Sequence, residues 1–312
     1  MAGESQTSNA VLLVRPRAFG FHAEAAASNA FAQASSDPDV QARALKEFDG
    51  LAERLAGAGV EVLVLDDEPE PRKPDAVFPN NWVSSHADGT LVLYPMATAS
   101  RQIERNVDGV KALLDSSGFD VRRLVDLSFH ERHGRFLEGT GSLVLDRPNR
   151  RAYASRSPRT DPAAIADFDD RLDYSTFIFE ARDRRGHPIY HTNVLMSLGT
   201  GFCVLCGETV DDPHRDVLIG ELEASGRTVI DVDYEQLRSF ACNLLELHGS
   251  SGPLIALSSA ALASFKPDQL RQLERFGALV DAPISTIEAV GGGSVRCMIA
   301  DIHLPRHQPG EN

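Results

Sequence analysis

The stretch Gly291-Gly292-Gly293-Ser294-Val295-Arg296-Cys297-Met298 decides how the rest of the chain is interpreted. Glycine has no Cβ, so three in a row let the backbone bend sharply and approach a ligand closely. A cysteine directly after such a loop can lie at the floor of a pocket. The apolar alternation in residues 298–302 predicts a strand that carries Cys297 on its edge. A free cysteine is more often a small core residue than a nucleophile, so other residues must support a catalytic interpretation.

Upstream of this stretch, one unit recurs along the chain. Its pattern predicts a strand with a polar first residue, a glycine turn, an apolar strand, a helix that ends at glycine, and another apolar strand. The polar landmark residues are separated by roughly fifty residues, which is the scale of a structural repeat. They are Asn81, Glu138, His191, Asn243 and Cys297. About five such units can bury their apolar faces only by closing on one another, so we expect the landmarks to surround one central cleft.

The same patterns give bounds for the expected elements. The hairpins are expected to begin at residues 82–84, 136–138, 193–195 and 243–245, and the Cys297 strand begins a partial fifth unit. Residues 19–36 are expected to form a loop with some helix, and whether this loop is a lid stays open. The expected helices span residues 40–58, 101–117, 162–172, 213–225 and 267–276.

Composition and charge favour a globular protein and argue against a protein that binds nucleic acid, spans a membrane or depends on disulfides. The 312 residues, 42% of them hydrophobic, are enough for a sizeable core, and the net charge of -14 argues against a nucleic-acid partner. Four cysteines do not make a disulfide framework in a chain of this length, and no apolar run predicts a signal peptide or a membrane span. We therefore expect a cytoplasmic protein without a membrane partner. Residues 1–10 are expected to be disordered or loosely ordered, 11–304 to form one catalytic domain, and 305–312 to be a flexible tail.

A cysteine and a histidine far apart in sequence, with acidic partners, are typical of an activated thiolate nucleophile. His191 opens an apolar run, and Glu138 lies between Leu137 and Gly139, where an acid is costly to bury without a partner. Asn81 precedes the single tryptophan and offers hydrogen bonds without charge, although a simple turn would also explain it. Cys203 has zinc-like spacing to its neighbour three residues on, but no second ligand pair follows, so neither a metal nor a nucleotide site is expected.

In the same order along the chain, four motifs resemble those of the guanidino-group-modifying penteins. This superfamily includes arginine deiminase, dimethylarginine dimethylaminohydrolase and the amidinotransferases, and the resemblance, over residues 11–304, is nearest to the citrulline-utilisation hydrolase, amidinotransferase-like branch. It implies an α/β fold: a five-bladed α/β propeller (pentein) of pseudo-fivefold ββαβ repeats around a central active-site cleft. The motifs are Phe78-Pro79-Asn80-Asn81, Phe136-Leu137-Glu138-Gly139, His191-Thr192-Asn193 and residues 291–298.

The resemblance also implies roles for single residues. Cys297 would be the nucleophile, His191 the general acid and base, and Glu138 a partner for the nitrogens of the substrate's planar end group. No metal or organic cofactor is implied. The substrate-binding residues would be Asp75, Asn80, Asn81, Asn193, Gly292, Gly293 and Arg296.

The departure from the resemblance predicts the substrate. Guanidinium hydrolases of this kind place carboxylates where this chain has Asn80 and Asn81, and commonly an aspartate where it has Asn193. A guanidinium is a fixed cation that favours carboxylates, whereas an amide can donate to the carbonyl of a neutral ureido group. We therefore expect hydrolysis of a ureido amino acid such as citrulline. The alternatives are an arginine deiminase, a dimethylarginine dimethylaminohydrolase, an amidinotransferase, and a non-catalytic binding protein of the same fold. Whether the chain forms a homo-oligomer is left open.

Overall fold

The computed structural model describes residues 4–308 and contains five separate three-stranded sheets. In every sheet the first strand is antiparallel to the middle strand, and the third is parallel to it. The sheets are β3 (Val83–Ser85), β4 (Thr90–Leu93), β5 (Arg123–Asp126); β6 (Val144–Asp146), β7 (Arg151–Ser155), β8 (Ser175–Phe179); β9 (Met196–Leu198), β10 (Phe202–Leu205), β11 (Thr228–Asp231); β12 (Leu245–Gly249), β13 (Gly252–Ser258), β14 (Ala278–Ala282); and β15 (Ala300–Asp301), β1 (Ala10–Arg15), β2 (Glu61–Asp66).

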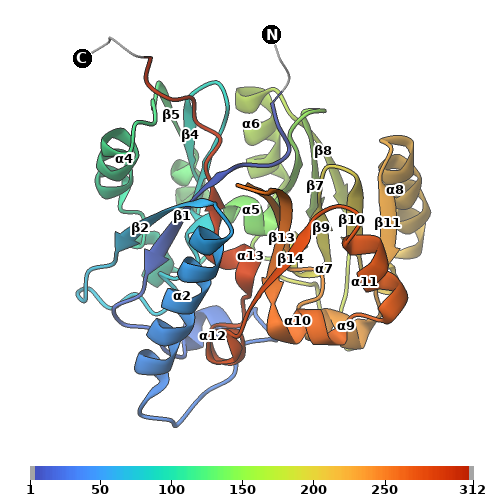
Figure 1. Ribbon diagram of the computed structural model, residues 1–312, viewed down its shortest axis with the longest axis horizontal. Coiled ribbons are helices and arrows are strands. Elements are labelled where there is room, and N and C mark those ends of the chain that lie inside the picture. Colours follow the sequence, from blue (N-terminus) through green and yellow to red (C-terminus); the bar gives the residue numbers. More distant parts are fainter. Residues whose placement is uncertain (1–3, 309–312) are drawn as a thin grey trace.

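A helix joins the two parallel strands of each sheet, because a parallel pair needs a long crossover connection. These helices lie toward the outside of the view in Figure 1, while short helices gather near its middle. Leu51 and Leu55 of α2 are fully buried against the sheets, and burial of one such side chain stabilises the fold by about 2 kcal/mol. The connecting helices are α2 (Val40–Gly57), α4 (Val107–Ser116), α6 (Pro162–Leu172), α8 (Asp212–Ala224), and α10 (Ser259–Ser264) with α11 (Pro267–Leu273).

The fifth sheet joins the two ends of the chain. Strand β15 pairs with β1, so that Asp301 lies opposite Val11 and Ala300 opposite Leu12. Strand β2 then pairs in parallel with β1 along six residues. The predicted mixed α/β fold with five repeated units is therefore confirmed. The chain begins with the middle strand of the fifth sheet, β1, and ends by adding that sheet's first strand, β15.

The predicted hairpins at residues 136–138 and 193–195 are wrong. Residues 136–138 lead into the short helix α5 (Gly139–Ser142), and residues 193–195 lie within the short helix α7 (Thr192–Leu195). In both sheets the first strand follows that helix. The Cys297 stretch behaves in the same way, with α13 (Val295–Met298) before β15. An apolar run of four residues fits one helical turn as well as a strand, so periodicity does not separate the two. The predicted helix over 101–117 is also divided, into α3 (Ala99–Gln102) and α4.

The N-terminal residues differ from the loose order that the sequence predicts. Gln6 Nε2 donates to the carbonyl oxygens of Leu145 (2.9 Å) and Leu198 (3.2 Å), and Glu4 is buried with its carboxylate 2.8 Å from Nη1 of Arg147. These polar groups bridge first strands of different sheets, which a polar composition alone does not reveal. Near the other end, Arg306 Nη1 donates to the carbonyl oxygen of Ser117 (2.8 Å); the remainder of the predicted tail, from residue 309, lies outside the described residues.

Within residues 4–308, no helix is both long enough and apolar enough to cross a bilayer.

Candidate active site

The predicted site residues lie on short turns that precede the first strand of each sheet. Glu138 and His191 come directly before α5 and α7, Cys297 lies in α13, and Asn81 ends the 3-10 helix η1 (Pro79–Asn81). Figure 1 shows α5, α7 and α13 near the middle of the view. The repeat therefore brings residues from different sheets to one place, as the landmark spacing predicts.

Cys297 and His191 line one small cavity of about 20 Å³, together with Asn81 and Asp75. Cys297 is 3% exposed and His191 1% exposed. A cavity of this size holds about one water molecule, so the site as it stands is closed.

The glycine run forms part of the cavity wall next to Cys297. Gly292 has a φ of +67°, a left-handed conformation that glycine tolerates best, and a Cβ there would lie 2.6 Å from the backbone nitrogen of Ala32. A Cβ on Gly293 would lie 2.9 Å from the ring of Phe78 and 3.3 Å from the Cβ of Cys297. Gly292 thus permits the close approach of the segment around Ala32, and Gly293 permits that of Phe78 and Cys297.

Glu138 contacts His191 and does not line the cavity. Its Oε2 lies 2.8 Å from Nε2 of His191 and 3.3 Å from Nη1 of Arg159. Burial raises the pKa of Glu138, but Arg159, the His191 contact and Arg101 outweigh it and leave that pKa well below its ordinary value. The carboxylate is therefore ionised and orients the imidazole, rather than meeting a substrate directly as the sequence predicts.

His191 is neutral near pH 7. Burial lowers its pKa to about 4, an effect larger than the opposing contribution of Glu138. Because the ionised Glu138 can only accept, Nε2 of a neutral His191 carries the hydrogen, and Nδ1 has a free lone pair. The imidazole can therefore act as a general base, and the resting site holds no imidazolium beside Cys297.

Two asparagine amides contact the sulfur of Cys297. Nδ2 of Asn193 lies 3.4 Å from Sγ, and Nδ2 of Asn243 lies 3.3 Å from it. Asn193 is a predicted substrate-binding residue whose amide the structure places on the sulfur of Cys297. Asn243 is a landmark of the repeat that we expect at the central cleft, but the sequence analysis assigns it no role there.

Asn81 presents an N–H group at the cavity. Its Oδ1 accepts from Nη1 of Arg101 (2.8 Å), and its Nδ2 donates to Oδ1 of Asn80 (3.0 Å), which leaves the second hydrogen of Nδ2 without a partner in residues 4–308. A Cβ on Gly141 would lie 2.5 Å from this nitrogen and 2.7 Å from Nδ1 of His191, so only glycine fits there. Asn80 is fully buried, donates from Nδ2 to Oγ1 of Thr140, and accepts the hydrogen bond from Asn81.

Two arginines on the cavity wall, Arg101 and Arg159, escaped the sequence analysis. Both are buried, and each lies in a polar stretch without a periodic pattern that would predict burial. Asp75, the carboxylate on the wall, accepts or shares a hydrogen with Nδ1 of His22 at 2.7 Å. The charged side chains that line the cavity are therefore two cations and one anion.

The segment around α1 (Ala23–Ala26) covers the cavity. Ala25 and Asn29 line it, and Nη2 of Arg159 donates to the carbonyl oxygen of Ala25 (2.5 Å). Nδ2 of Asn29 donates to the carbonyl oxygen of Gly292 (3.2 Å). The loop expected at residues 19–36 thus contacts the opposite walls of the site.

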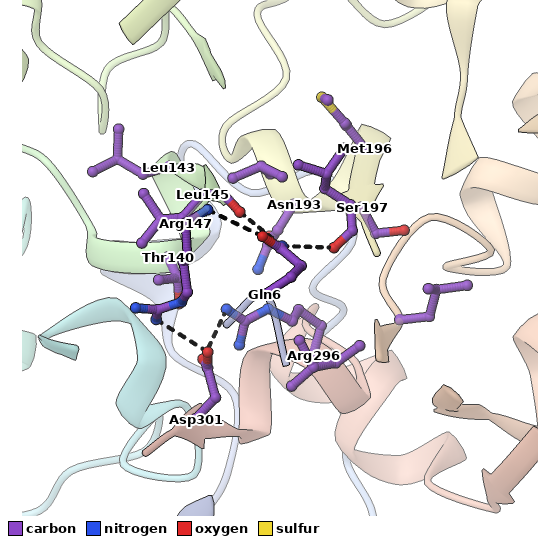
Figure 2. Close-up of a pocket in the computed structure, with 14 residues that line it drawn as sticks. Gln6, Thr140, Leu143, Leu145, Arg147, Asn193, Met196, Ser197, Arg296 and Asp301 are labelled. Carbon is purple, nitrogen blue, oxygen red and sulfur yellow. Dashed lines mark hydrogen bonds and ion pairs between the residues drawn. The ribbon is translucent and has the colours of Figure 1, made fainter. Parts of the chain in front are cut away.

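Arg296 does not line the cavity that holds Cys297. It lies on a second cavity of about 30 Å³, where its Nη2 is 3.2 Å from Oδ1 of Asp301. Figure 2 shows Gln6 among Asn193, Arg147 and Arg296, with Asp301 joined to both arginines. Asn193 separates the two cavities. Among the described residues, no group of three or more histidine, cysteine or acidic side chains is placed to hold a metal ion.

Solved structures show the same fold at low sequence identity. The N-terminal domain of ArgZ, an arginine dihydrolase from the ornithine–ammonia cycle in Cyanobacteria, has a TM-score of 0.72 and 18% identity over 95% of this chain and 99% of that one. Unliganded AgrE has a TM-score of 0.70 and 19% identity over 96% of this chain and 40% of that one. The Pseudomonas aeruginosa DDAH bound to citrulline has a TM-score of 0.66 and 13% identity over 94% and 98%. No curated protein matches the chain in sequence.

A family model described as N,N dimethylarginine dimethylhydrolase, eukaryotic, matches residues 15–304, nearly the whole described chain. Together with the fold, this match confirms the predicted resemblance to the guanidino-group-modifying penteins and the enzyme class, hydrolases of carbon–nitrogen bonds other than peptide bonds. The chain belongs to the N,N-dimethylarginine dimethylhydrolase family of the pentein superfamily.

Proposed function

We propose that the chain hydrolyses the ureido group of citrulline, or of an N-substituted relative, through a covalent intermediate on Cys297. The products from citrulline are ornithine, ammonia and carbon dioxide. We also propose that the five sheets are arranged as the five blades of a propeller around this site.

The observation that carries the proposal is the charge of the cavity wall. Arg101, which is paired with Glu104, and Arg159, which is paired with Glu138, line it, and Asp75, the carboxylate there, is paired with His22. A substrate guanidinium is a permanent cation, and two unit charges of like sign about 4 Å apart repel by about 4 kcal/mol at an effective dielectric constant of about 20. A neutral ureido group avoids this repulsion, while either arginine can pair with the α-carboxylate of the amino acid.

Asn81 supports the same substrate. Its carbonyl oxygen is occupied by Arg101, so the amide offers the cavity a donor rather than an acceptor. The carbonyl oxygen of a ureido group needs a donor, and this need grows when the oxygen becomes an oxyanion. An aspartate at this position would present an acceptor and repel that oxygen.

The proposed reaction uses these groups in two steps. His191 Nδ1 takes the proton of the Cys297 thiol, the sulfur attacks the ureido carbon, and Asn81 donates to the oxyanion. The carbon–nitrogen bond to ornithine breaks as His191 returns the proton to the leaving amine. His191 then deprotonates a water, which displaces the sulfur and releases carbamate, the source of ammonia and carbon dioxide.

Access to the site requires movement of residues 22–33. The cavity of about 20 Å³ is too small for an amino acid, and Ala25 and Asn29 close it through hydrogen bonds to Arg159 and Gly292. We propose that this segment opens as a lid.

A second candidate is hydrolysis of a guanidine, as in an arginine deiminase, arginine dihydrolase or dimethylarginine hydrolase. The family match and the presence of Asp75 on the wall favour it, because a carboxylate can pair with a guanidinium. Displacement of His22 from Asp75 when the lid opens would free that carboxylate.

Assays of the purified protein with citrulline, arginine and dimethylarginine, following ornithine and citrulline, separate these candidates. The proposal expects ornithine from citrulline with a kcat/KM at least about 100-fold above that for arginine, in line with the cost of a buried charge mismatch. Release of citrulline or ornithine from arginine or dimethylarginine, with a kcat/KM above that for citrulline, would support the second candidate. An amidinotransferase would need an added acceptor amine. A binding protein would turn over none of the three, and the Cys297→Ala variant serves as the inactive control.

A further inference from the structure

Asn243 is held with its amide nitrogen toward the sulfur of Cys297. The side chain is fully buried, and Nδ2 donates to the carbonyl oxygen of Asn193 (2.9 Å) as well as to Sγ (3.3 Å). The opposite orientation of the amide would direct Oδ1 at the carbonyl oxygen of Asn193, two acceptors in contact. The position of the donor is therefore fixed by the surrounding backbone.

Asn243 joins the two turns that carry the reacting groups. Its side chain contacts α7, and its carbonyl oxygen accepts from the backbone nitrogen of Arg296 in α13 (3.4 Å). It lies before β12, the first strand of its own sheet, as His191 lies before β9, the first strand of the preceding one. All five sheets then contribute a landmark residue to the site.

The neutral state of His191 creates the need for such a donor. When the thiol proton moves to Nδ1, the S–H bond breaks, an N–H bond forms, and a negative sulfur is left in a buried place. Burial also disfavours the imidazolium formed in that step, as the low pKa of His191 indicates. Hydrogen bonds to a charged form favour that form, and two amide N–H groups are placed on the sulfur.

We propose that Asn243 is a further catalytic residue, which together with Asn193 stabilises the Cys297 thiolate through amide N–H groups. The inference rests on the proposed function only in taking Cys297 as the nucleophile, and it holds for a ureido or a guanidine substrate alike.

The test is the rate of iodoacetamide modification at Cys297, read by peptide mass spectrometry in Asn243→Asp, Asn243→Ala and Asn243→Ser. Asp has the shape of Asn but replaces the N–H donor with an anion. We therefore expect Asn243→Asp to lower the rate of modification at Cys297 the most, by about 100-fold or more. Asn243→Ala removes the donor and should lower this rate about 10-fold. Asn243→Ser keeps a hydroxyl donor, so its rate should lie between those of Asn243→Ala and the unchanged protein. Thermal unfolding of each variant, and the modification of Cys242 in the core, report on the fold.

A purely structural role predicts another order, in which Asp, the closest in shape, is the mildest change. That order, or a rate that Asp leaves unchanged, overturns the inference. If Cys297 of the unchanged protein reacts no faster than Cys242, the proposed function fails first. If Cys297 reacts fast and Asp leaves it fast, only the role of Asn243 fails.

Discussion

His191 and His303 each pair with a buried carboxylate, and of these two pairs only that of His191 adjoins Cys297. His191 Nε2 is 2.8 Å from Glu138, and His303 Nε2 is 2.8 Å from Asp301. Arg159 and Arg101 surround Glu138, whereas Arg147 and Arg296 surround Asp301. In both pairs the pKa of the histidine is lowered, by burial first, and the pKa of the acid is lowered by the arginines against burial.

What differs is the neighbourhood of the second imidazole nitrogen. The cavity beside His191 contains Cys297 and the Asn81 amide, while the groove beside His303 is lined by residues such as Thr7, His248 and Arg306, without a cysteine among them. The Asp301 pair instead joins residues near both chain ends, since Arg147 also binds Glu4. A histidine that is hydrogen-bonded to an ionised acid therefore does not by itself indicate a catalytic site. A reactive side chain such as Cys297 must also lie beside the imidazole.

The largest difference should appear when each histidine is removed. His191→Ala removes the base and should lower kcat with citrulline by about 10²–10⁴-fold, the usual contribution of general acid–base catalysis. His303→Ala, the matched variant, should keep kcat close to that of the unchanged protein and lose stability instead. Steady-state rates and thermal unfolding of both variants measure the contrast, and equal losses of kcat would contradict it.

Replacing Asp301 or Glu138 by its amide should further separate the roles of the two histidine–carboxylate pairs. Asp301→Asn leaves the part-buried Arg296 without this carboxylate and the buried Arg147 with Glu4 alone, so the free energy of unfolding in urea should fall by about 3–5 kcal/mol, with little change in kcat of the folded protein. Glu138→Gln should lower stability too, but should also lower kcat strongly, because the carboxylate no longer fixes the hydrogen on Nε2 of His191. A Glu138→Gln variant with unchanged kcat would show that the acid serves the fold alone.

The pH dependence should separate catalysis from stability. The pKa of His191 is about 4, below its ordinary 6.5, so the base stays unprotonated and kcat/KM should fall only as the pH approaches about 4. The unfolded chain, however, binds a proton at this histidine below about 6.5, and likewise at His303, so stability should decline as the pH falls from about 6.5 toward 4. Rates and thermal unfolding midpoints across this range test both statements; an acid limb of kcat/KM near 6.5 would refute the first.

The smallest effect should come from Gln6 at the second cavity. Gln6→Ala removes the hydrogen bonds to Leu145, Leu198 and the backbone nitrogen of Arg147, and should cost about 1–3 kcal/mol of stability. Because Cys297 does not line this cavity, kcat and KM for citrulline should not change. A change in KM would connect the second cavity to substrate binding.

Part of this site could be predicted from the sequence because the repeat places one polar residue at the same position in each unit. Cys297, His191 and Glu138 stand at such positions, and the glycine run beside Cys297 has a steric purpose that its composition suggests. The asparagines at 80 and 81 were recognised because they replace charges expected from the resemblance.

The other residues of the site could not be predicted because the direction of a side chain on a short turn cannot be read from the sequence. Arg296 adjoins Cys297 in sequence, but successive residues of a helical turn point about 100° apart, so its guanidinium reaches the other cavity. Arg101 and Arg159 are buried where they contact Asn81 and Glu138 of their own units, which lie 20 and 21 residues earlier in the chain. Contacts over such a separation exceed the period of a helix or a strand and leave no local pattern.

The central claim is that Cys297 carries the carbon of a neutral ureido group during turnover. Rapid acid quenching of the protein during turnover of citrulline, followed by peptide mass spectrometry, tests it most directly. The account predicts a carbamoyl group on Cys297 that is absent from Cys203, Cys206 and Cys242 and absent in Cys297→Ala. Citrulline turnover that leaves no adduct on Cys297, or an adduct that forms from arginine but never from citrulline, would contradict it.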